Sequence, residues 1–350
     1  MKQVLFLDGV CPYVYDFEYL KTNPSGASES YLNMLARALY LKGKCEVYIF
    51  QHNRKKPDLQ HGIKYIGFDD LENLNKNNID AVVVQRHTGT IPFAKKEFKN
   101  AKIVLWNHDF FESTSFYDLD IKELKKFNTP IVCLTEWHKK NFQYNFELRG
   151  AKVDPNVIPH FVVENEVTLK NDVITNKIRN EFTLGFFSSE HKGLNTTLQA
   201  FSHLFMNNHD FNIYVASPSY HQFETSINLP NVHLKECQSR SDVIKLMSEC
   251  HALLHLNNIY PETFGCVHAE ANLVGTPVYS YDLGANNEVI DRFNDFVIKP
   301  KKYSADPFGY DTVLQKIMNN ISTGVPNVQL KKEFELENVL PKWLNLLELY

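Results

Sequence analysis

Short apolar runs recur along the chain and alternate with segments whose apolar residues repeat at helical spacing. In the first half these runs cover residues 4–7, 47–50, 81–84, 103–106 and 131–134. They are rich in β-branched and aromatic residues and lack polar alternation, which is typical of parallel strands covered on both faces. Between the first two runs, apolar residues from 31 to 40 recur as on one face of a helix. The pattern predicts a doubly wound α/β sheet.

The same alternation begins again after a polar stretch poor in aromatic residues. Strand-like runs lie at 183–187, 213–216, 232–234 and 252–256. The last segment repeats apolar residues at helical spacing around Pro341. We therefore expect a first domain at 1–162, a linker at 163–180, a second domain at 181–328 and a C-terminal helical segment at 329–350.

Two glutamates lie eight positions apart across a glycine in the second half of the chain. The stretch reads Pro-Glu-Thr-Phe-Gly-Cys-Val-His-Ala-Glu from Pro261 to Glu270. An apolar run precedes it, and Gly275-Thr276-Pro277 followed by a second apolar run closes it, which predicts a strand-loop-helix-strand unit. Glu262 is then expected on the loop and Glu270 on the helix.

Two carboxylates in this arrangement can bind the hydroxyl groups of a sugar or a ribose. An ionised carboxylate only accepts hydrogen bonds, and vicinal diols donate them in pairs. Thr263, Phe264 and Gly265 lie near the predicted start of the helix, where backbone N–H groups can bind ligand oxygens. The alternative is a helix whose two acidic side chains are merely solvated.

The stretch resembles the E-x7-E signature of retaining glycosyltransferases with the GT-B fold, family 4 in particular. The resemblance continues through Gly-Ala-Asn-Asn-Glu-Val-Ile at residues 284–290. It implies two Rossmann-like domains that face each other across a cleft, with a C-terminal helix crossing back to the first domain. It also implies that Glu262 faces the donor sugar and that Glu270 holds the ribose.

Lys192-Gly193 is a candidate phosphate-binding element, because it follows a predicted strand and precedes a predicted helix. It resembles the G-R-x4-K-G element of the same family, although nothing basic except His191 lies between Thr183 and Lys192. Arg240 is a candidate for the missing second cation. A solvated lysine in a turn is the alternative.

Two candidates lie in the first domain. Ser25-Gly26 resembles the glycine loop of the family, with Ser25 in place of the first glycine, and predicts an anion or acceptor site at a helix start. A plain strand-helix turn is the alternative. His108 and Asp109 directly follow a predicted strand, at the end where doubly wound sheets bind ligands. The resemblance implies that His108 lines the donor and acceptor site, whereas a histidine satisfied by the loop backbone is the alternative.

No metal site is expected. Asp118-Leu119-Asp120 has the D-x-D form that holds a metal in the other large glycosyltransferase fold, but it precedes a helical pattern and is read as helix capping. The six cysteines form no C-x-x-C pair, which favours reduced thiols. A cofactor is not expected either, since the donor would be a substrate.

Composition is that of a globular protein, with 43% hydrophobic and 22% charged residues. The formal charge of −4 argues against a nucleic-acid binder. Residues 1–160 hold 22 basic and 19 acidic side chains, and residues 161–350 hold 15 and 22. The basic excess of the first half suits an acidic acceptor or weak peripheral contact with an anionic membrane, with an ordinary solvated face as the alternative. No signal peptide or membrane span is recognised, so the expected location is cytoplasmic, including the inner membrane face.

The resemblance and the residues together predict a metal-independent, retaining glycosyltransferase. Its donor would be a UDP- or GDP-sugar, and its acceptor a glycan or a lipid-linked glycan. Glu262, Lys192 and His108 are the expected catalytic residues. The alternatives are a catalytically silent nucleotide-sugar or sugar-binding protein, and a nucleotide-sugar epimerase or phosphorylase of the same fold.

Overall fold

The chain divides into two compact units in a computed structural model. The model describes residues 1–23, 25–43, 45–111, 118–162, 182–216, 228–237, 239–300, 306–324 and 327–350. The first unit comprises Met1–Leu20, Gly26–Phe161 and Leu336–Tyr350, and the second comprises Lys21–Ser25 and Val162–Glu335. The expected linker at 163–180 lies outside the described residues.

The part of the chain before residue 162 forms one sheet with helices between its strands. The strands are β1 (Gln3–Asp8), β2 (Glu46–Gln51), β3 (Asp58–Gln60), β4 (Ile63–Ile66), β5 (Ala81–Gln85), β6 (Lys102–Trp106), β7 (Ile131–Cys133) and β8 (Asn156–Val157). The helices are α1 (Phe17–Thr22), α2 (Ala27–Leu41), α3 (Phe68–Asn73), α4 (Ile91–Glu97), α5 (Asp118–Phe127) and α6 (Glu136–Glu147).

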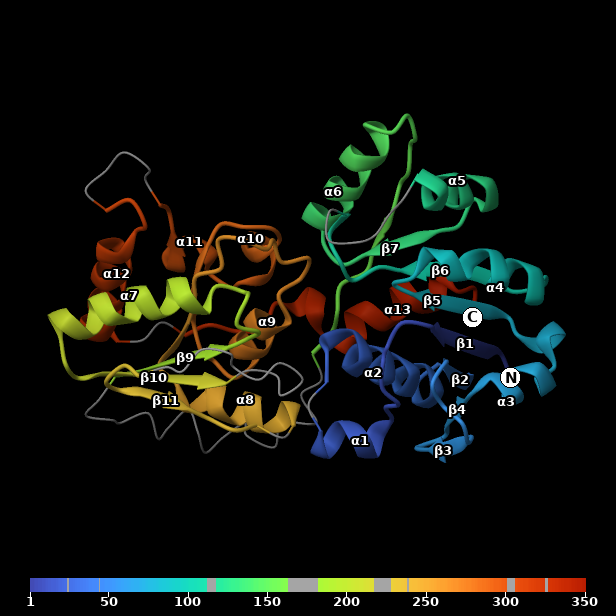
Figure 1. The fold of residues 1–350 in the computed structure, drawn as a ribbon, viewed down its shortest axis with the longest axis horizontal. Helices are drawn as coiled ribbons and strands as arrows, with labels where there is room; N and C mark the ends of the chain where they lie inside the picture. Colours follow the sequence, from blue (N-terminus) through green and yellow to red (C-terminus); the bar gives the residue numbers. More distant parts are fainter. Residues whose placement is uncertain are drawn as a thin grey trace. The chain divides into compact units, whose positions relative to one another are not determined.

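The strand order of this sheet is β3-β4-β2-β1-β5-β6-β7-β8. All neighbouring pairs are parallel except β3 with β4. The chain moves outward from β1 first on one side and then on the other, so β1 and β5 lie at the switch point of a doubly wound sheet (Figure 1). Ligands of such sheets bind outside the carboxyl ends of the strands at this point.

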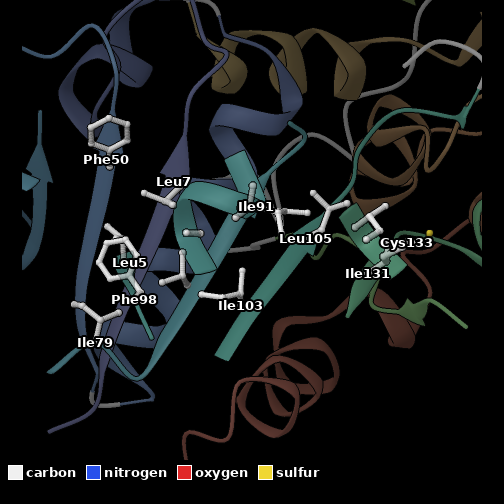
Figure 2. Close-up of a cluster of buried hydrophobic side chains, with 14 of the residues drawn as sticks. Leu5, Leu7, Phe50, Ile79, Ile91, Phe98, Ile103, Leu105, Ile131 and Cys133 are labelled. Carbon is white, nitrogen blue, oxygen red and sulfur yellow. The ribbon is translucent and has the colours of Figure 1, made fainter. Parts of the chain in front are cut away.

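A contiguous apolar cluster packs one face of the first sheet. Leu5 and Leu7 of β1 and Leu105 of β6 point into it with Ile91 and Phe98 from the helical layer (Figure 2). These side chains are at most 1% exposed. Burial of this extent is what the uninterrupted apolar runs of the sequence predicted, because both faces of each strand are covered.

The described residues of the second unit repeat the architecture with six strands, all parallel. The strands are β9 (Phe182–Phe187), β10 (Phe211–Ala216), β11 (Val232–Leu234), β12 (Ala252–His255), β13 (Val278–Tyr281) and β14 (Val297–Ile298), in the order β11-β10-β9-β12-β13-β14. The helices are α7 (Leu194–Asn207), α8 (Arg240–Glu249), α9 (Cys266–Leu273), α10 (Asn286–Val289), α11 (Phe293–Phe296) and α12 (Tyr310–Thr323).

Successive residues of the second sheet enter different cores. Leu254 packs in a cluster with residues of α7 and α12, whereas Leu253 packs in a cluster with residues of α8 and α9. Helices α7 and α12 lie side by side on the first of these faces (Figure 1). Because the strand is buried on both faces, helix α9 is fixed against the sheet immediately beside the carboxyl ends of its strands.

The C-terminal helix α13 (Leu336–Leu346) belongs to the first unit, although it follows the whole of the second along the chain. Trp343 lies edge-on to Trp106 at the end of β6, with ring centroids 4.9 Å apart. Lys42 forms an ion pair with Glu337 at 2.6 Å. Pro341 is tolerated inside this helix. The prediction that the C-terminal helix crosses back to the first domain is confirmed.

Candidate functional site

The start of helix α9 is built on a glycine in the left-handed region. Gly265 is the N-cap residue, with φ of 80°. A Cβ atom at this position would lie 2.6 Å from Nδ1 of His268, so a larger residue meets both strain and a clash. The turn brings the chain from the loop after β12 directly into the helix, and the helix N-terminus carries a partial positive charge. This end of α9 is therefore suited to an anionic group.

Glu262 is held in place through its own backbone. Its carbonyl accepts the N–H of Ala285 at 2.8 Å, and the residue forms a bridge with Gly284. Gly284 has φ of 71°, and a Cβ there would approach the Glu262 carbonyl oxygen to 2.4 Å. The glycine therefore permits the close approach of two loops that fixes the glutamate. The Glu262 side chain is buried.

Lys192 is the cationic partner of Glu262. Its Nζ donates to both carboxylate oxygens, at 2.9 and 3.1 Å. Burial opposes ionisation of Glu262, but Lys192 and two nearby histidines hold the pKa of its carboxyl below the usual value. Glu262 is thus a carboxylate at neutral pH. The lysine side chain remains 35% exposed and can contact a ligand while it is paired.

The position of Lys192 follows from the next residue. Gly193 has φ of 93° and is the N-cap of α7. A Cβ on it would lie 2.7 Å from Cα of Asn257, in the loop after β12. Only glycine allows the two loops to pack this closely, so Lys192, in the turn between β9 and α7, reaches the glutamate that follows β12.

A second ion pair joins Arg240 to Glu270. The Nε atom of Arg240 lies 2.7 Å from Oε1 of Glu270, and both side chains are mostly buried. Arg240 is the first residue of α8, whose start is fixed by a capping box between Ser239 and Asp242. The sequence suggested Arg240 as a second cation beside Lys192. In the structure Arg240 pairs with Glu270, whereas Lys192 pairs with Glu262.

Phe264 and Thr263 lie on the loop between the two pairs. The Phe264 side chain is buried and packs edge-on against Phe334 at 5.0 Å. Its ring therefore anchors the loop, and only its backbone can serve a ligand. The two predicted glutamates, Lys192 and the start of α9 are all brought together at the carboxyl end of the second sheet.

Two histidines of this site escaped the sequence analysis. His255 ends β12, and His268 lies in the first turn of α9. Nε2 of His268 is 3.0 Å from Nδ1 of His255, and both rings are buried. Burial lowers the pKa of His255 to about 4 and that of His268 to about 3, so both are neutral at pH 7. The one sequence signal for this pair is that a histidine lies in each of two neighbouring predicted elements, the strand before the loop and the helix after it.

The candidate residues of the first unit gather at the end of β6. Asp109 accepts two hydrogen bonds from Arg86, at 2.8 and 3.1 Å. The ring of His108 lies between Trp106, at 4.6 Å, and His160, at 5.2 Å. Burial, with contributions from His160 and Arg86, lowers the pKa of His108 well below its usual value. A neutral imidazole is therefore available there.

Arg86 was missed by the sequence analysis, although it follows β5 directly, as His108 follows β6. It has φ of 61°, which is unusual for a residue with a Cβ. Strained backbone of this kind clusters at functional sites because the surrounding structure must enforce it. The Arg86–Asp109 pair thus belongs with His108 in the candidate site of the first unit.

The Ser25-Gly26 turn differs from the expected glycine loop. Gly26 is the N-cap of α2 with φ of −65°, a conformation open to any residue. Its N–H donates to the hydroxyl of Tyr13 at 3.4 Å. An anion at this helix start would have to replace that contact. The glycine instead provides room, because a Cβ on it would lie 2.3 Å from Oε2 of the buried Glu29.

One group in the described part of the chain has the composition of a metal site. Asp8, Cys11 and Glu29 are buried, and one potential ligand atom of each lies within 4.8 Å of the others. Both Asp8 oxygens already accept hydrogen bonds, from two backbone N–H groups and from Tyr15. Helix α5 begins at Asp118 and so includes both aspartates of the D-x-D segment, but the side chains of Asp118 and Asp120 lie outside the described residues, and the capping interpretation stays a prediction.

None of the described helices combines the length and the apolar composition needed to cross a bilayer.

Comparison with known proteins finds a family-model match within the second unit. Residues 183–308 match the family model described as glycosyl transferases group 1. This region contains Lys192, Arg240, Glu262 and Glu270. No curated protein sequence matches the chain.

Solved structures extend the likeness to both units. HepE from Anabaena, in complex with UDP and glucose, has a TM-score of 0.70 at 17% identity, over 99% of this chain and 100% of its own. Sucrose-phosphate synthase from Thermosynechococcus elongatus has a TM-score of 0.70 at 12% identity, over 99% and 98%. The α,α-trehalose 6-phosphate synthase from Burkholderia multivorans has a TM-score of 0.62 at 9% identity, over 98% and 94%. At these identities the likeness concerns the fold. The predicted fold class, with two Rossmann-like doubly wound domains of GT-B type, is confirmed.

Proposed function

We propose that the chain is a glycosyltransferase that moves a sugar from a nucleoside-diphosphate sugar to a glycan or lipid-linked acceptor with retention of configuration. The observation that carries the proposal is the pair of buried carboxylates, each joined to a cation, around the start of α9 in a region that matches group 1 glycosyltransferases.

The chemistry of the two ion pairs fits the two ends of such a donor. Glu262 accepts hydrogen bonds from the hydroxyls of the transferred sugar, and Glu270 accepts them from the ribose diol. The Lys192 ammonium lies beside Glu262, as the first phosphates lie beside the sugar in a nucleotide sugar. The positive end of α9 adds to the field that the diphosphate meets.

Charge balance favours departure of the diphosphate. Each carboxylate is neutralised by its own cation before a ligand arrives. As the bond from the sugar to the diphosphate breaks, negative charge grows on the phosphate oxygens, and Lys192 and the backbone N–H groups at Gly265 stabilise it. Lys192 and the dipole of α9 take the place that a metal ion occupies in other transferases. No metal or cofactor is part of this scheme.

Retention follows in this proposal from attack on the face that the diphosphate leaves, with a phosphate oxygen helping to deprotonate the acceptor hydroxyl. The HepE structure, which holds UDP and glucose, supports a nucleoside diphosphate as the product side of the reaction. Either UDP or GDP satisfies the diphosphate and ribose contacts that the site offers.

The acceptor is assigned to the first unit. Neutral His108 can accept a hydrogen bond from a sugar hydroxyl or donate one to it. The Arg86–Asp109 ion pair offers charged groups beside His108. The basic excess of residues 1–160 suits an acidic glycan or a lipid-linked acceptor at the cytoplasmic face of a membrane.

A catalytically silent nucleotide-sugar-binding protein is the second candidate. It is favoured by one observation, the absence of any arginine between Thr183 and Lys192, which leaves one lysine near the phosphates. Turnover separates this candidate from a transferase, because a silent protein binds the donor and leaves it intact.

A donor screen tests the proposal. The melting temperature of the protein should rise with one or more members of a panel of UDP- and GDP-sugars, because a ligand that binds only the folded state stabilises it. Glu270→Ala should abolish the shift by removing the ribose contact, whereas Glu249→Ala on α8 should keep it. A panel without any shift would contradict the proposal.

A further inference from the structure

We propose that His255 and His268 form a positioning pair for the donor site, and that this pair takes up one proton from solvent when a nucleotide sugar binds. The inference rests on the proposed function, since it concerns the same ligand. It assigns a role to two buried groups that the transfer scheme does not otherwise use.

The pair connects the two elements that build the site. His255 ends β12, immediately before the loop that carries Glu262, and His268 lies in the first turn of α9. The two rings meet edge to face, with centroids 4.8 Å apart. The ring of Phe186 stacks on His255 at 5.6 Å and closes the apolar side. Nδ1 of His268 lies close to Gly265, the N-cap residue at the end of α9 that is the candidate anion site.

The hydrogen bond between the rings fixes how their protons are arranged. Two neutral imidazoles share one N–H, donated from one ring to the lone pair of the other at 3.0 Å. The two outer nitrogens, His255 Nε2 and His268 Nδ1, have no hydrogen-bond partner within the described residues. One of these outer atoms carries a hydrogen and the other a lone pair. The pair can therefore accept one further proton without breaking its internal bond.

Two charged groups act on the pair. Glu262, on the loop before α9, favours protonation of both rings, and Lys192, before α7, opposes it. Farther along α9, Glu270 is neutralised by Arg240 of α8. In the ligand-free protein Glu262 and Lys192 neutralise each other, so nothing offsets the burial of a charged imidazole, and both rings stay neutral.

Donor binding changes this balance. A diphosphate at the start of α9 attracts Lys192 and draws positive charge away from Glu262. The buried carboxylate then lacks a full cationic partner, which is costly in this environment. A proton added to the free lone pair of the histidine pair restores neutrality beside Glu262 and faces the anion through Gly265. The same proton holds Glu262 in position for the sugar hydroxyls.

Proton uptake is measurable by isothermal titration calorimetry with UDP-glucose as the probe and GDP-mannose as a second probe. Neither carries a phosphate monoester, whose second pKa near about 6 would confuse the measurement. Titrations at pH 6 in two buffers of different ionisation enthalpy give the number of protons taken up. The expected result is a positive number, up to about one per nucleotide sugar, with an affinity that increases by up to about tenfold per unit of falling pH.

Variants separate the pair from a merely structural role. His255→Phe with His268→Leu removes both titrating rings and both outer polar atoms, and should bind the probe with no proton uptake and no pH dependence. His268→Gln keeps a hydrogen-bonding side chain but leaves His255 as the one titrating ring of the pair, and should take up fewer protons than the wild type. His251→Asn is the matched control. His251 is also buried, but it accepts the N–H of Thr183 at the opposite end of β12, so wild-type uptake should persist.

The outcomes are distinguishable from failure of the proposed function. Absence of binding by either probe, or by any member of the donor panel, overturns the proposed function and this inference with it. Binding by the wild type without proton uptake overturns the inference alone. Equal uptake by the wild type and by the folded double variant His255→Phe/His268→Leu would also overturn it, because the proton would then bind elsewhere.

Discussion

Lys192 carries more of the electrostatic load in this site than a lysine with a neighbouring arginine would. Its ammonium donates to both oxygens of Glu262, and between Thr183 and Lys192 the sequence holds no basic residue other than His191. The geometry explains how it is held in place: Gly193 packs on the loop after β12, and the paired carboxylate fixes the ammonium next to the start of α9.

Lys192→Ala should therefore reduce turnover by a factor near the upper end of about a hundred to a thousand, because it removes a preorganised stabiliser of a departing anion. Single-turnover rates with the donor found in the screen check this. Lys245→Ala, an exposed lysine on α8, is the control and should have wild-type rates. An unchanged rate for Lys192→Ala would favour the second candidate, a catalytically silent nucleotide-sugar-binding protein.

Arg240 and Glu270 should be energetically coupled. Both side chains are mostly buried, so truncating either leaves the other charge without its partner. A double-mutant cycle with Arg240→Ala and Glu270→Ala should give a coupling of about 1–3 kcal/mol in the free energy of unfolding. The exposed pair Arg292–Asp295, with side chains nearly half exposed, should give at most about 0.5 kcal/mol. Additive effects for the buried pair would mean that the contact contributes nothing in solution.

The site residues that could be proposed from the sequence are those whose type and position along the chain already indicate a role. Glu262, Glu270 and Lys192 sit at ends of predicted elements, and the motif fixed their spacing. The partners could not be predicted, since Arg240 meets Glu270 only because α8 packs beside α9. The His255–His268 pair was missed for the same reason: one residue lies in an apolar strand and the other in a helix, and a hydrogen bond across thirteen residues has no local signal.

At the scale of the element, helix α9 determines the site. It is eight residues long, it enters through Gly265, and it leaves through Gly275, which also has a positive φ. Its first turn lies against the histidine pair and its body carries Glu270. A change at the first glycine therefore acts on the ligand site, and a change at the second acts on the helix end alone.

Gly265→Ala should destabilise the fold by on the order of 1–3 kcal/mol and abolish nucleotide-sugar binding, because it combines a left-handed backbone with a 2.6 Å approach to His268 Nδ1. Gly275→Ala is a matched control. Its φ is +73°, but a Cβ would meet nothing closer than 3.9 Å. Gly275→Ala should lose stability through backbone strain and should still bind the nucleotide sugar. Chemical denaturation and calorimetry measure the two effects separately, and loss of binding in both variants would contradict a specific role for the first turn.

The strands that coincide with apolar runs were predictable, and four further strands were not. Each predicted apolar run of residues 4–134 and 183–280 corresponds to an observed strand. The missed strands β3, β4, β8 and β14 have two to four residues each. A run that short carries no periodicity, and the neighbouring strand rather than the local sequence decides whether it pairs.

At the scale of the whole molecule, two doubly wound units each present polar residues at the carboxyl ends of their strands. The second unit holds the glutamates and their cations, and the first holds His108 with the Arg86–Asp109 pair. The chain passes from the first unit to the second between Phe161 and Val162, and residues 336–350 belong to the first unit again.

Removal of divalent metal ions should leave activity nearly intact. In the proposed reaction Lys192 and the N-terminus of α9 stabilise the developing charge, and no step involves a metal. Initial rates in EDTA should remain within about twofold of those in magnesium or manganese, since no metal-dependent contribution to the barrier is invoked. Complete loss in EDTA that manganese restores would point to a metal-bound donor and against the proposed electrostatics.

The most direct test of the central claim is release of nucleoside diphosphate from a panel of UDP- and GDP-sugars, followed by ³¹P NMR for the wild type and Glu262→Gln. The wild type should release the diphosphate from at least one donor, slowly with water and faster with a suitable glycan. Glu262→Gln is nearly isosteric but cannot pair with Lys192 as a carboxylate. It should bind the same donor and release the diphosphate at least about a hundredfold more slowly. Binding of a donor by the wild type with no release, or equal release by Glu262→Gln, would contradict the claim that this site catalyses glycosyl transfer.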